Sequence, residues 1–194
     1  MKLNTILILS IVMAAAILSL SGNEIEAQQK MTSSAGSEIV FPNVKGKNLL
    51  KKEMNLPQDL GGELNLVIVA FERKQQSTID VWMPHVKALT ERFPRLRYYE
   101  IPTISKQPFF VRSFIDGGMR SGIPDPKARE ATITLYLDKQ KFRNSLGITT
   151  EKKIYLFLVD RKGKVFGSWE DAYSAAKLAE IEKKVGEIIP TSVS

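Results

Sequence analysis

The clearest pattern of apolar positions lies between residues 64 and 93. Residues 64–71 (LNLVIVAF) are almost all apolar, with several β-branched side chains, which predicts a strand covered on both faces. After a polar turn, apolar side chains recur every three or four positions, which predicts an amphipathic helix. The residues on its apolar face are Ile79, Trp82, Met83, Val86, Leu89 and Phe93.

This helix carries signals at its start and in its interior. Ser77 or Thr78 is the expected N-cap, because a hydroxyl there can accept a hydrogen bond from a free backbone N–H. Asp80 is expected in the first turn, where the helix dipole favours a negative charge. Pro84 lies inside the apolar pattern and is expected to kink the helix, since it removes one backbone donor.

Further strands and helices alternate along the rest of the chain. Strands are expected at residues 96–102, ended by Pro102, at 131–138, and on both sides of a tight turn within 153–170. Helices are expected at residues 107–115, 139–146 and 174–189. Residues 116–126 (DGGMRSGIPDP) are interpreted as a flexible loop, and residues 41–62 as a hairpin-like beginning. This order predicts an α/β fold, a central mixed sheet flanked by helices on both faces.

The first residues have the pattern of a secretory signal peptide, expected to occupy residues 1–27. Lys2 is followed by an apolar run over residues 6–20 and by a signal peptidase site after Ala27. A helix over that run spans about 22 Å, short of the roughly 30 Å hydrocarbon layer of a membrane, so cleavage is expected. An uncleaved anchor stays the alternative, because signal and anchor segments overlap in length.

Composition bounds the rest of the chain. Residues 28–40 are polar and aperiodic, which predicts a flexible lead-in, and residues 41–194 are long enough for one packed domain. The chain has a formal net charge of +7 and no cysteine, which excludes disulfides and thiol chemistry. An exported basic protein meets lipid or acidic proteins rather than nucleic acid. The basic residues are scattered, so a solvated surface explains them equally well.

The order of elements resembles the thioredoxin-like superfamily, with the layout of exported thiol-disulfide proteins of the TlpA type. In that layout a strand-ending Phe, two cysteines and a kinking Pro follow at fixed spacing, and Phe71, Gln76, Ile79 and Pro84 stand at these positions without a gap. The segment from Asp160 to Gly163 is similar to the hairpin turn of these proteins. The resemblance covers roughly residues 41–189 and implies a thioredoxin-like fold.

Two departures from that layout bear on function. Gln76 and Ile79 replace both cysteines, and residues 148–160 contain no Pro where the superfamily has its cis-Pro. A thioredoxin needs one thiolate to attack a disulfide and a second thiol to resolve the intermediate, and neither Gln nor Ile can perform these steps.

Within the superfamily, the chain resembles the mitochondrial ATP synthase assembly-factor family. The resemblance rests on "FPNVKGKNLL", the "VAF…W" strand and helix, Gly118-Met119-Arg120, "ATITLYLD" and "YLFLVDRKGKVFGSWEDA". Members of that family lack the redox pair and help to install the membrane-embedded subunit of the proton channel. The resemblance implies a non-enzymatic binding protein that acts as an assembly factor or chaperone for a membrane complex.

The former active-site edge is the expected contact surface, because thioredoxin folds engage peptides at this turn and the neighbouring loops. The candidate contact residues are Arg73, Lys74, Gln75, Gln76, Ser77, Met119, Arg120 and Trp169. The expected partner is a protein, with a membrane surface as a further option. The expected location is periplasmic or extracellular, with or without membrane association.

Other chemistry has weaker support. His85 is the only histidine and no nucleophile motif accompanies it, so a surface or groove position is favoured over a catalytic one. No metal and no cofactor are expected, since a His/Cys cluster cannot form and residues 116–126 lack the ending of a phosphate loop. Trp82 is expected in the core, and Trp169 is equally compatible with core and contact roles. An enzyme or small-ligand protein with an unrecognised pocket stays an alternative, as does a structural protein.

Overall fold

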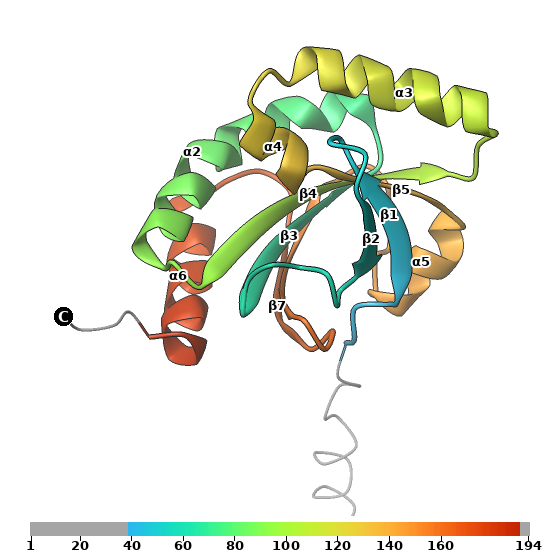
Figure 1. The fold of residues 1–194 in the computed structure, drawn as a ribbon. Helices are drawn as coiled ribbons and strands as arrows, with labels where there is room; N and C mark the ends of the chain where they lie inside the picture. The colour runs from blue at the N-terminus through green and yellow to red at the C-terminus, as the bar shows by residue number, and fades with distance from the viewer. Residues whose placement is uncertain (1–38, 191–194) are drawn as a thin grey trace, which may run out of the picture. The chain divides into compact units, whose positions relative to one another are not determined.

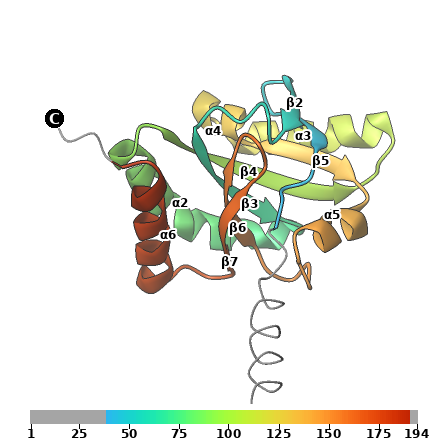
Figure 2. The same ribbon diagram turned by 90° about the horizontal axis from the view of Figure 1, so that it is seen from below.

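A seven-stranded mixed sheet forms the centre of the computed structural model, which describes residues 39–190 (Figures 1 and 2). The strands are β1 (Val44–Asn48), β2 (Glu53–Leu56), β3 (Leu64–Ala70), β4 (Leu96–Ser105), β5 (Ile133–Leu137), β6 (Tyr155–Asp160) and β7 (Val165–Glu170). Their order is β2-β1-β5-β4-β3-β6-β7. The three central strands β5, β4 and β3 are parallel, and the outer ones pair antiparallel. The expected signal peptide and most of the lead-in lie outside the described residues.

Helices cover both faces of this sheet, as the sequence predicts. They are the 3-10 turn η1 (Arg73–Gln75) and the helices α2 (Gln76–Arg92), α3 (Phe109–Gly122), α4 (Pro126–Ala131), α5 (Lys139–Ser145) and α6 (Ala175–Ile188). The α2 and α6 helices share one apolar core with the sheet, and α5 shares the other. No helix between residues 39 and 190 is long and apolar enough to cross a membrane.

The β3 strand explains why the two cores meet at the centre. All seven of its residues are buried. Side chains alternate across a strand, so Leu66 and Ile68 pack toward α2 and α6, whereas Val67 and Val69 pack toward α5. The continuous apolar run in the sequence therefore reflects a strand covered on both faces, as expected.

The start of α2 differs from the sequence-based expectation. The N-cap position is Gln75, not Ser77 or Thr78, because η1 leads directly into the helix. Ser77 lies in the first turn and its hydroxyl donates to the carbonyl of Lys74 at 3.1 Å, while Asp80 lies just beyond that turn. Pro84 is inside the helix, as predicted.

Two boundaries in the middle of the chain were also predicted incorrectly. The β4 strand does not end at Pro102, which pairs with Ala70, the last residue of β3; beyond it β4 continues by pairing with β5. Residues 116–122 are not a loop, because α3 continues through both Gly117 and Gly118. These differences matter for function, since the end of β3, the extended β4 and α3 together form the site described next.

Candidate functional site

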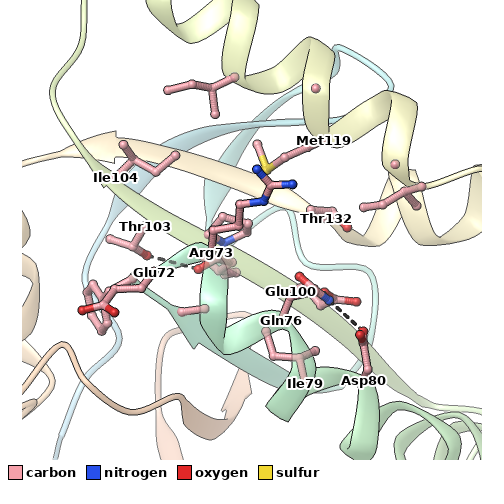
Figure 3. Close-up of a pocket in the computed structure, with 18 of the residues that line it drawn as sticks. Glu72, Arg73, Gln76, Ile79, Asp80, Glu100, Thr103, Ile104, Met119 and Thr132 are labelled. Carbon is pink, nitrogen blue, oxygen red and sulfur yellow. Dashed lines mark hydrogen bonds between the residues drawn. The ribbon is translucent and has the colours of Figure 1, made fainter.

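A cleft of about 680 Å³ opens between the start of α2, β4 and α3, beyond the carboxyl end of β3 (Figure 3). We call it the α2–α3 cleft. Its lining includes Ala70, Phe71, Glu72, Arg73, Gln76, Ile79, Asp80, Glu100, Ile101, Pro102, Thr103, Ile104, Phe114, Ile115, Gly118, Met119, Gly122, Ile123 and Thr132. Mostly apolar walls with a few converging polar groups are typical of binding sites, and the ends of parallel strands are a common place for them.

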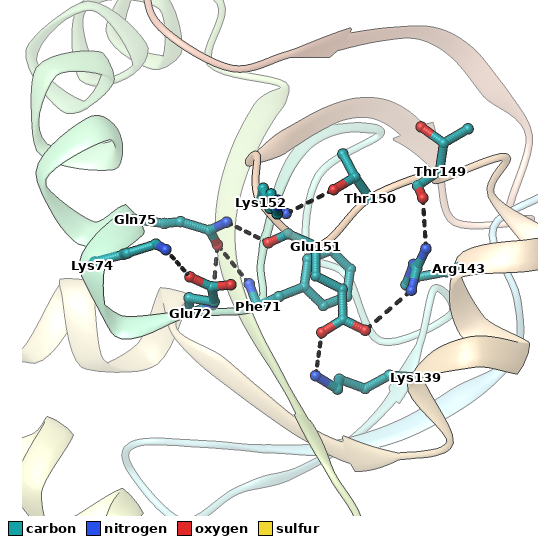
Figure 4. A network of polar contacts seen from close by, with 10 residues as sticks. All are labelled: Phe71, Glu72, Lys74, Gln75, Lys139, Arg143, Thr149, Thr150, Glu151 and Lys152. Atoms are coloured by element: carbon teal, nitrogen blue, oxygen red, sulfur yellow. Dashed lines mark hydrogen bonds and ion pairs between the residues drawn. The ribbon is translucent and has the colours of Figure 1, made fainter.

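Gln75 fixes the turn that leads from β3 into the cleft. Its side-chain oxygen accepts hydrogen bonds from the backbone N–H groups of Phe71 and Glu72, at 2.8 and 3.1 Å, and its Nε2 donates to the carbonyl of Glu151 at 2.7 Å (Figure 4). The side chain is only 5% exposed. Gln75 therefore holds the turn in place and presents no surface to a partner, unlike the sequence-based expectation.

The two degenerate redox positions have different environments. Ile79 is 2% exposed and packs into the core beneath the cleft. Gln76 is exposed at the cleft, where its Nε2 donates to Asp80 Oδ1 at 3.0 Å and lies 3.5 Å from Glu100 Oε2. An amide and an aliphatic group at these positions supply neither a nucleophile nor a redox group.

Glu100 is the main polar feature that sequence reasoning missed. It lies on β4 and is 8% exposed, the only acidic or basic side chain classed as buried among residues 39–190. Burial raises the pKa of its carboxyl and the nearby Asp80 adds to this effect, while the Gln76 hydrogen bond and Lys87 lower the pKa. An acidic residue within an apolar strand pattern, "LRYYEIP", was the available signal.

The α3 helix forms the outer wall of the cleft but packs little against the apolar core. None of its residues is buried, and Phe109, Phe110 and Phe114 are 77%, 73% and 84% exposed. Polar contacts attach the helix: Tyr136 Oη donates to Asp116 Oδ1 at 2.8 Å and lies 3.3 Å from the carbonyl of Arg112, and Arg120 Nε donates to the carbonyl of Leu49 at 2.8 Å. The Arg120 guanidinium therefore serves as an anchor for α3.

The remaining candidates near the cleft are differently placed. Arg73 extends from η1 toward α3, on the side where Met119 lies (Figure 3). Among the described residues, no carboxylate lies within ion-pair distance of Arg73. Lys74 is exposed and pairs with Glu72 at 2.6 Å, and Ser77 is exposed beside it. The structure thus brings Arg73, Gln76 and Met119 to one cleft.

A polar network supports the cleft from behind (Figure 4). The Glu151 carboxylate contacts Lys139 and, at 3.2 Å, Arg143, both on α5. The hydrogen bond from Lys139 is the main cause of the lowered pKa of Glu151. Because the Glu151 carbonyl also receives the Gln75 amide, the segment before β6 is joined to both α2 and α5. This is the segment where the superfamily has its cis-Pro.

Trp169 and His85 lie outside the cleft. Trp169 is on β7, at the edge of the sheet, and its Nε1 donates to Glu180 Oε2 at 2.9 Å. His85 stacks on Tyr173 with ring centroids 4.0 Å apart. Trp82 is fully buried as expected and donates to the carbonyl of Asp171 at 3.1 Å. No group of three His, Cys, Asp or Glu side chains in the described part of the chain could hold a metal ion.

The structure combines a thioredoxin-like sheet with a site that lacks cysteine, and this combination limits the families to which the chain can belong. The sequence model of the ATP10 protein family matches residues 28–171. The chain belongs to the ATP10 protein family. This membership confirms the resemblance drawn from the sequence and indicates an ATP synthase assembly factor with protein partners. A comparison with curated proteins gives no significant match.

Solved structures confirm the thioredoxin-like fold of this ATP10 family member. Yeast Sco1 with copper bound superposes with a TM-score of 0.54 at 10% identity, covering 82% of this chain and 100% of Sco1. BsSco, a member of the Sco family of cytochrome c oxidase assembly proteins, gives 0.51 at 13% identity, covering 81% and 96%. A putative electron transfer protein from Aquifex aeolicus VF5 gives 0.55 at 7% identity, covering 77% and 96%. At these identities the likeness concerns the fold alone.

Phe114 is the second cleft residue of this ATP10 family member that sequence reasoning missed. The segment "FFVRSFI" was interpreted as a short helix before a loop, and its phenylalanines were given no role. Three phenylalanines in one short segment were the available signal. Only the structure shows that α3 buries none of its residues, so that these side chains are exposed.

Proposed function

We propose that this protein is a non-enzymatic assembly factor that binds an unassembled subunit of a membrane complex, such as ATP synthase, at the α2–α3 cleft. Family membership supports the assembly role. The observation that carries the choice of site is the cleft itself: it lies where a thioredoxin holds its cysteines, but Gln76 and Ile79 leave it an apolar surface without reactive groups. Such a surface can hold a polypeptide reversibly, since no covalent intermediate forms.

The exposed aromatic side chains on α3 give further support. Soluble proteins rarely leave several neighbouring phenylalanines uncovered, and such patches commonly mark interaction sites. Phe110 and Phe114 are one helical turn apart, and Phe114 lines the cleft, so the apolar surface continues from the cleft along α3. A membrane-complex subunit before assembly exposes apolar segments that would be covered by this surface.

The location belongs to the same proposal. The apolar run at residues 6–20 would direct the chain to the export pathway, and the protein would then act on the exported side of a membrane, free or attached. A basic surface would be attracted to anionic lipid there, which would keep the protein close to membrane-embedded partners.

Photo-crosslinking in the native host tests this function. A photoreactive amino acid would replace Gln76 or Met119 in the cleft, and Lys141 on α5 as an exposed control on the other face of the sheet. We expect the two cleft positions, and not position 141, to capture a subunit of a membrane complex, identified by mass spectrometry of the adducts. Equal background adducts at all three positions would overturn the proposal.

A further inference from the structure

Glu100 is a buried carboxyl group without an adequate partner in the α2–α3 cleft. It is 8% exposed, and its one side-chain hydrogen bond in the described structure is the 3.5 Å contact with Gln76. That distance is well beyond the usual 2.9 Å of an N–H···O hydrogen bond. A buried carboxylate normally has a charged partner or several short hydrogen bonds, because losing its hydration costs several kcal/mol. Glu100 has neither, and it lines the wall of an open cleft (Figure 3).

Two carboxyl groups face the same amide group at this place. The Gln76 amide donates to Asp80 at 3.0 Å and reaches Glu100 only at the long distance given above. Asp80 also lines the cleft. The two carboxyl groups therefore converge on one neutral amide, and their mutual repulsion raises the pKa of Glu100 beyond the effect of burial. A cation placed between them would replace the weak contact and offset both charges.

The walls around this acidic pair are mostly apolar, and the cleft also contains the cationic Arg73 on the side of Met119. Ile79 and Ile101 lie on the α2 and β4 sides, and Phe114, Ile115 and Met119 lie on the α3 side. The apolar surface then continues along α3 to Phe110, which is largely exposed and one helical turn from Phe114. A small cation would leave this apolar surface uncovered, whereas a polypeptide segment several residues long would cover it.

We propose that the α2–α3 cleft binds an apolar polypeptide segment that contains one lysine or arginine, and that the cationic group of this residue lies between Glu100 and Asp80. This proposal rests on the proposed function and specifies the chemistry of the partner. Basic residues within apolar segments are costly until they find a counter-charge, so a factor that supplies a buried carboxylate would hold such a segment before its own assembly partner does. Glu100 is then the specificity-determining residue, and the α3 phenylalanines provide contact area.

Fluorescent peptides and the full-length protein provide the test. Three peptides would share an apolar sequence with serine-glycine ends for solubility and differ at the central residue, which is lysine, leucine or glutamate. Binding would be measured by fluorescence anisotropy for the wild type, for Glu100→Gln, and for Glu91→Gln, the same change at an exposed position of α2 outside the cleft. Spermidine and anionic phospholipid vesicles would be added as competitors.

We expect the lysine peptide to bind about tenfold more tightly than the leucine peptide, and the glutamate peptide to bind weakest, as for a charge pair worth a little over 1 kcal/mol. Glu100→Gln should abolish the preference for lysine while leucine-peptide binding continues, and Glu91→Gln should behave as the wild type. Equal binding of all three peptides to the wild type and to Glu100→Gln would overturn this inference but leave the proposed function intact. No binding of any peptide, together with absent crosslinks, would overturn both.

The competitors separate other occupants from a polypeptide. If spermidine displaces the lysine peptide at equal concentration, the site recognises a small cation and the inference is wrong. If vesicles displace every peptide equally from the wild type and from Glu100→Gln, the cleft is a lipid-facing surface and the inference is again wrong. Failure of both competitors at concentrations where unlabelled lysine peptide succeeds supports the proposal.

Discussion

Individual residues at this site are placed by contacts that differ sharply between sequence neighbours. Gln75 and Gln76 have the same side chain, yet Gln75 is buried with three good hydrogen bonds and Gln76 stands exposed at the cleft. Gln75 fixes the turn after β3, and Gln76 contacts both Asp80 and Glu100. A structural glutamine and a functional one thus occupy adjacent positions, and the difference comes from the orientation that η1 gives to each.

Glu100 gives a prediction at the scale of one residue. Because burial raises its pKa in the folded protein, the unfolded chain loses this proton at a lower pH than the folded protein does. The free energy of unfolding therefore falls as pH rises from the unfolded pKa through the folded pKa. Glu100→Gln removes the ionisation, so we expect the variant to be more stable than the wild type at pH 7.5 and equal to it near pH 4.

Thermal unfolding at both pH values measures this effect. Each kcal/mol gained should raise the midpoint by about 2–4 °C in a chain of this size. Glu91→Gln, which makes the same change at an exposed position, should alter neither value. A Glu100→Gln variant that is less stable than the wild type at pH 7.5 would show that Glu100 is a structural acceptor and not a charge retained at a cost to stability.

At the scale of elements, α3 is set apart from the rest of the fold. It buries no residue, and contacts through Asp116 and Arg120 attach it to β5 and to the turn after β1. Gly117 and Gly118 in its interior lower its intrinsic stability further, because glycine loses more backbone freedom in a helix than alanine does. A helix of this kind can open without unfolding the sheet, which would let the cleft admit a bulky segment.

Gly117→Ala should stabilise α3 through its higher helix propensity. No atom lies within 4 Å of an added Cβ at this position, so the gain should be about 0.5–1 kcal/mol. Native-state hydrogen exchange should show α3 amides protected about two- to fivefold more, and the unfolding midpoint should rise by about 1–4 °C. Gly62→Ala is the opposite control, since its Cβ would lie 2.4 Å from the carbonyl oxygen of Leu64, and it should lower the midpoint. In both the wild type and Gly117→Ala the α3 amides should exchange faster than those of β3, and equal protection of the two elements would show that α3 unfolds with the core.

At the scale of the whole molecule, the features predicted correctly from the sequence are those that depend on the local periodicity of apolar residues. The buried strand at residues 64–70 and the helix that follows it were predicted from their apolar patterns, as were the α/β order and the turn at Gly163, which has a φ of +92°. The continuation of β4 past Pro102 depends on pairing with β5, and the length of α3 depends on contacts with Tyr136 and Leu49. These partners are distant in sequence, so no local pattern reports them.

The location of the candidate site was predicted correctly from local sequence, but some of its residues were not. The spacing from Phe71 to Pro84 located the start of α2, where Arg73 and Gln76 do line a cleft. The same spacing could not show that Glu100 faces Gln76, because this requires the register of β4 beside β3 and the position of α2 over both. Trp169 was grouped with these residues because it is expected at a strand end beside Glu170 and Asp171, but β7 lies at the edge of the sheet, outside the cleft.

Glu151 connects the two faces of the molecule, and its variant gives a prediction at this largest scale. Its carboxylate binds Lys139 and Arg143 on α5, and its carbonyl receives Gln75 from the start of α2. Because the ion pairs lower the pKa of Glu151 in the folded protein, their stabilisation is present above the unfolded pKa and is lost as pH falls through the folded pKa. The change in the free energy of unfolding with pH therefore has the opposite sign to the change caused by Glu100.

We therefore expect Glu151→Gln to lower the free energy of unfolding by about 1 kcal/mol at pH 7.5, the upper range for partly exposed ion pairs, and to have little effect at pH 3. Denaturant titration at both pH values measures the difference, and the double variant with Glu100→Gln should show additive changes, since the two carboxyl groups share no partner. A loss of equal size at pH 3 would mean that packing of the side chain, not its charge, joins α5 to α2. If the charge of Glu151 joins α5 to α2, acidification should weaken this connection. It should also reduce the repulsion between Glu100 and Asp80 in the cleft.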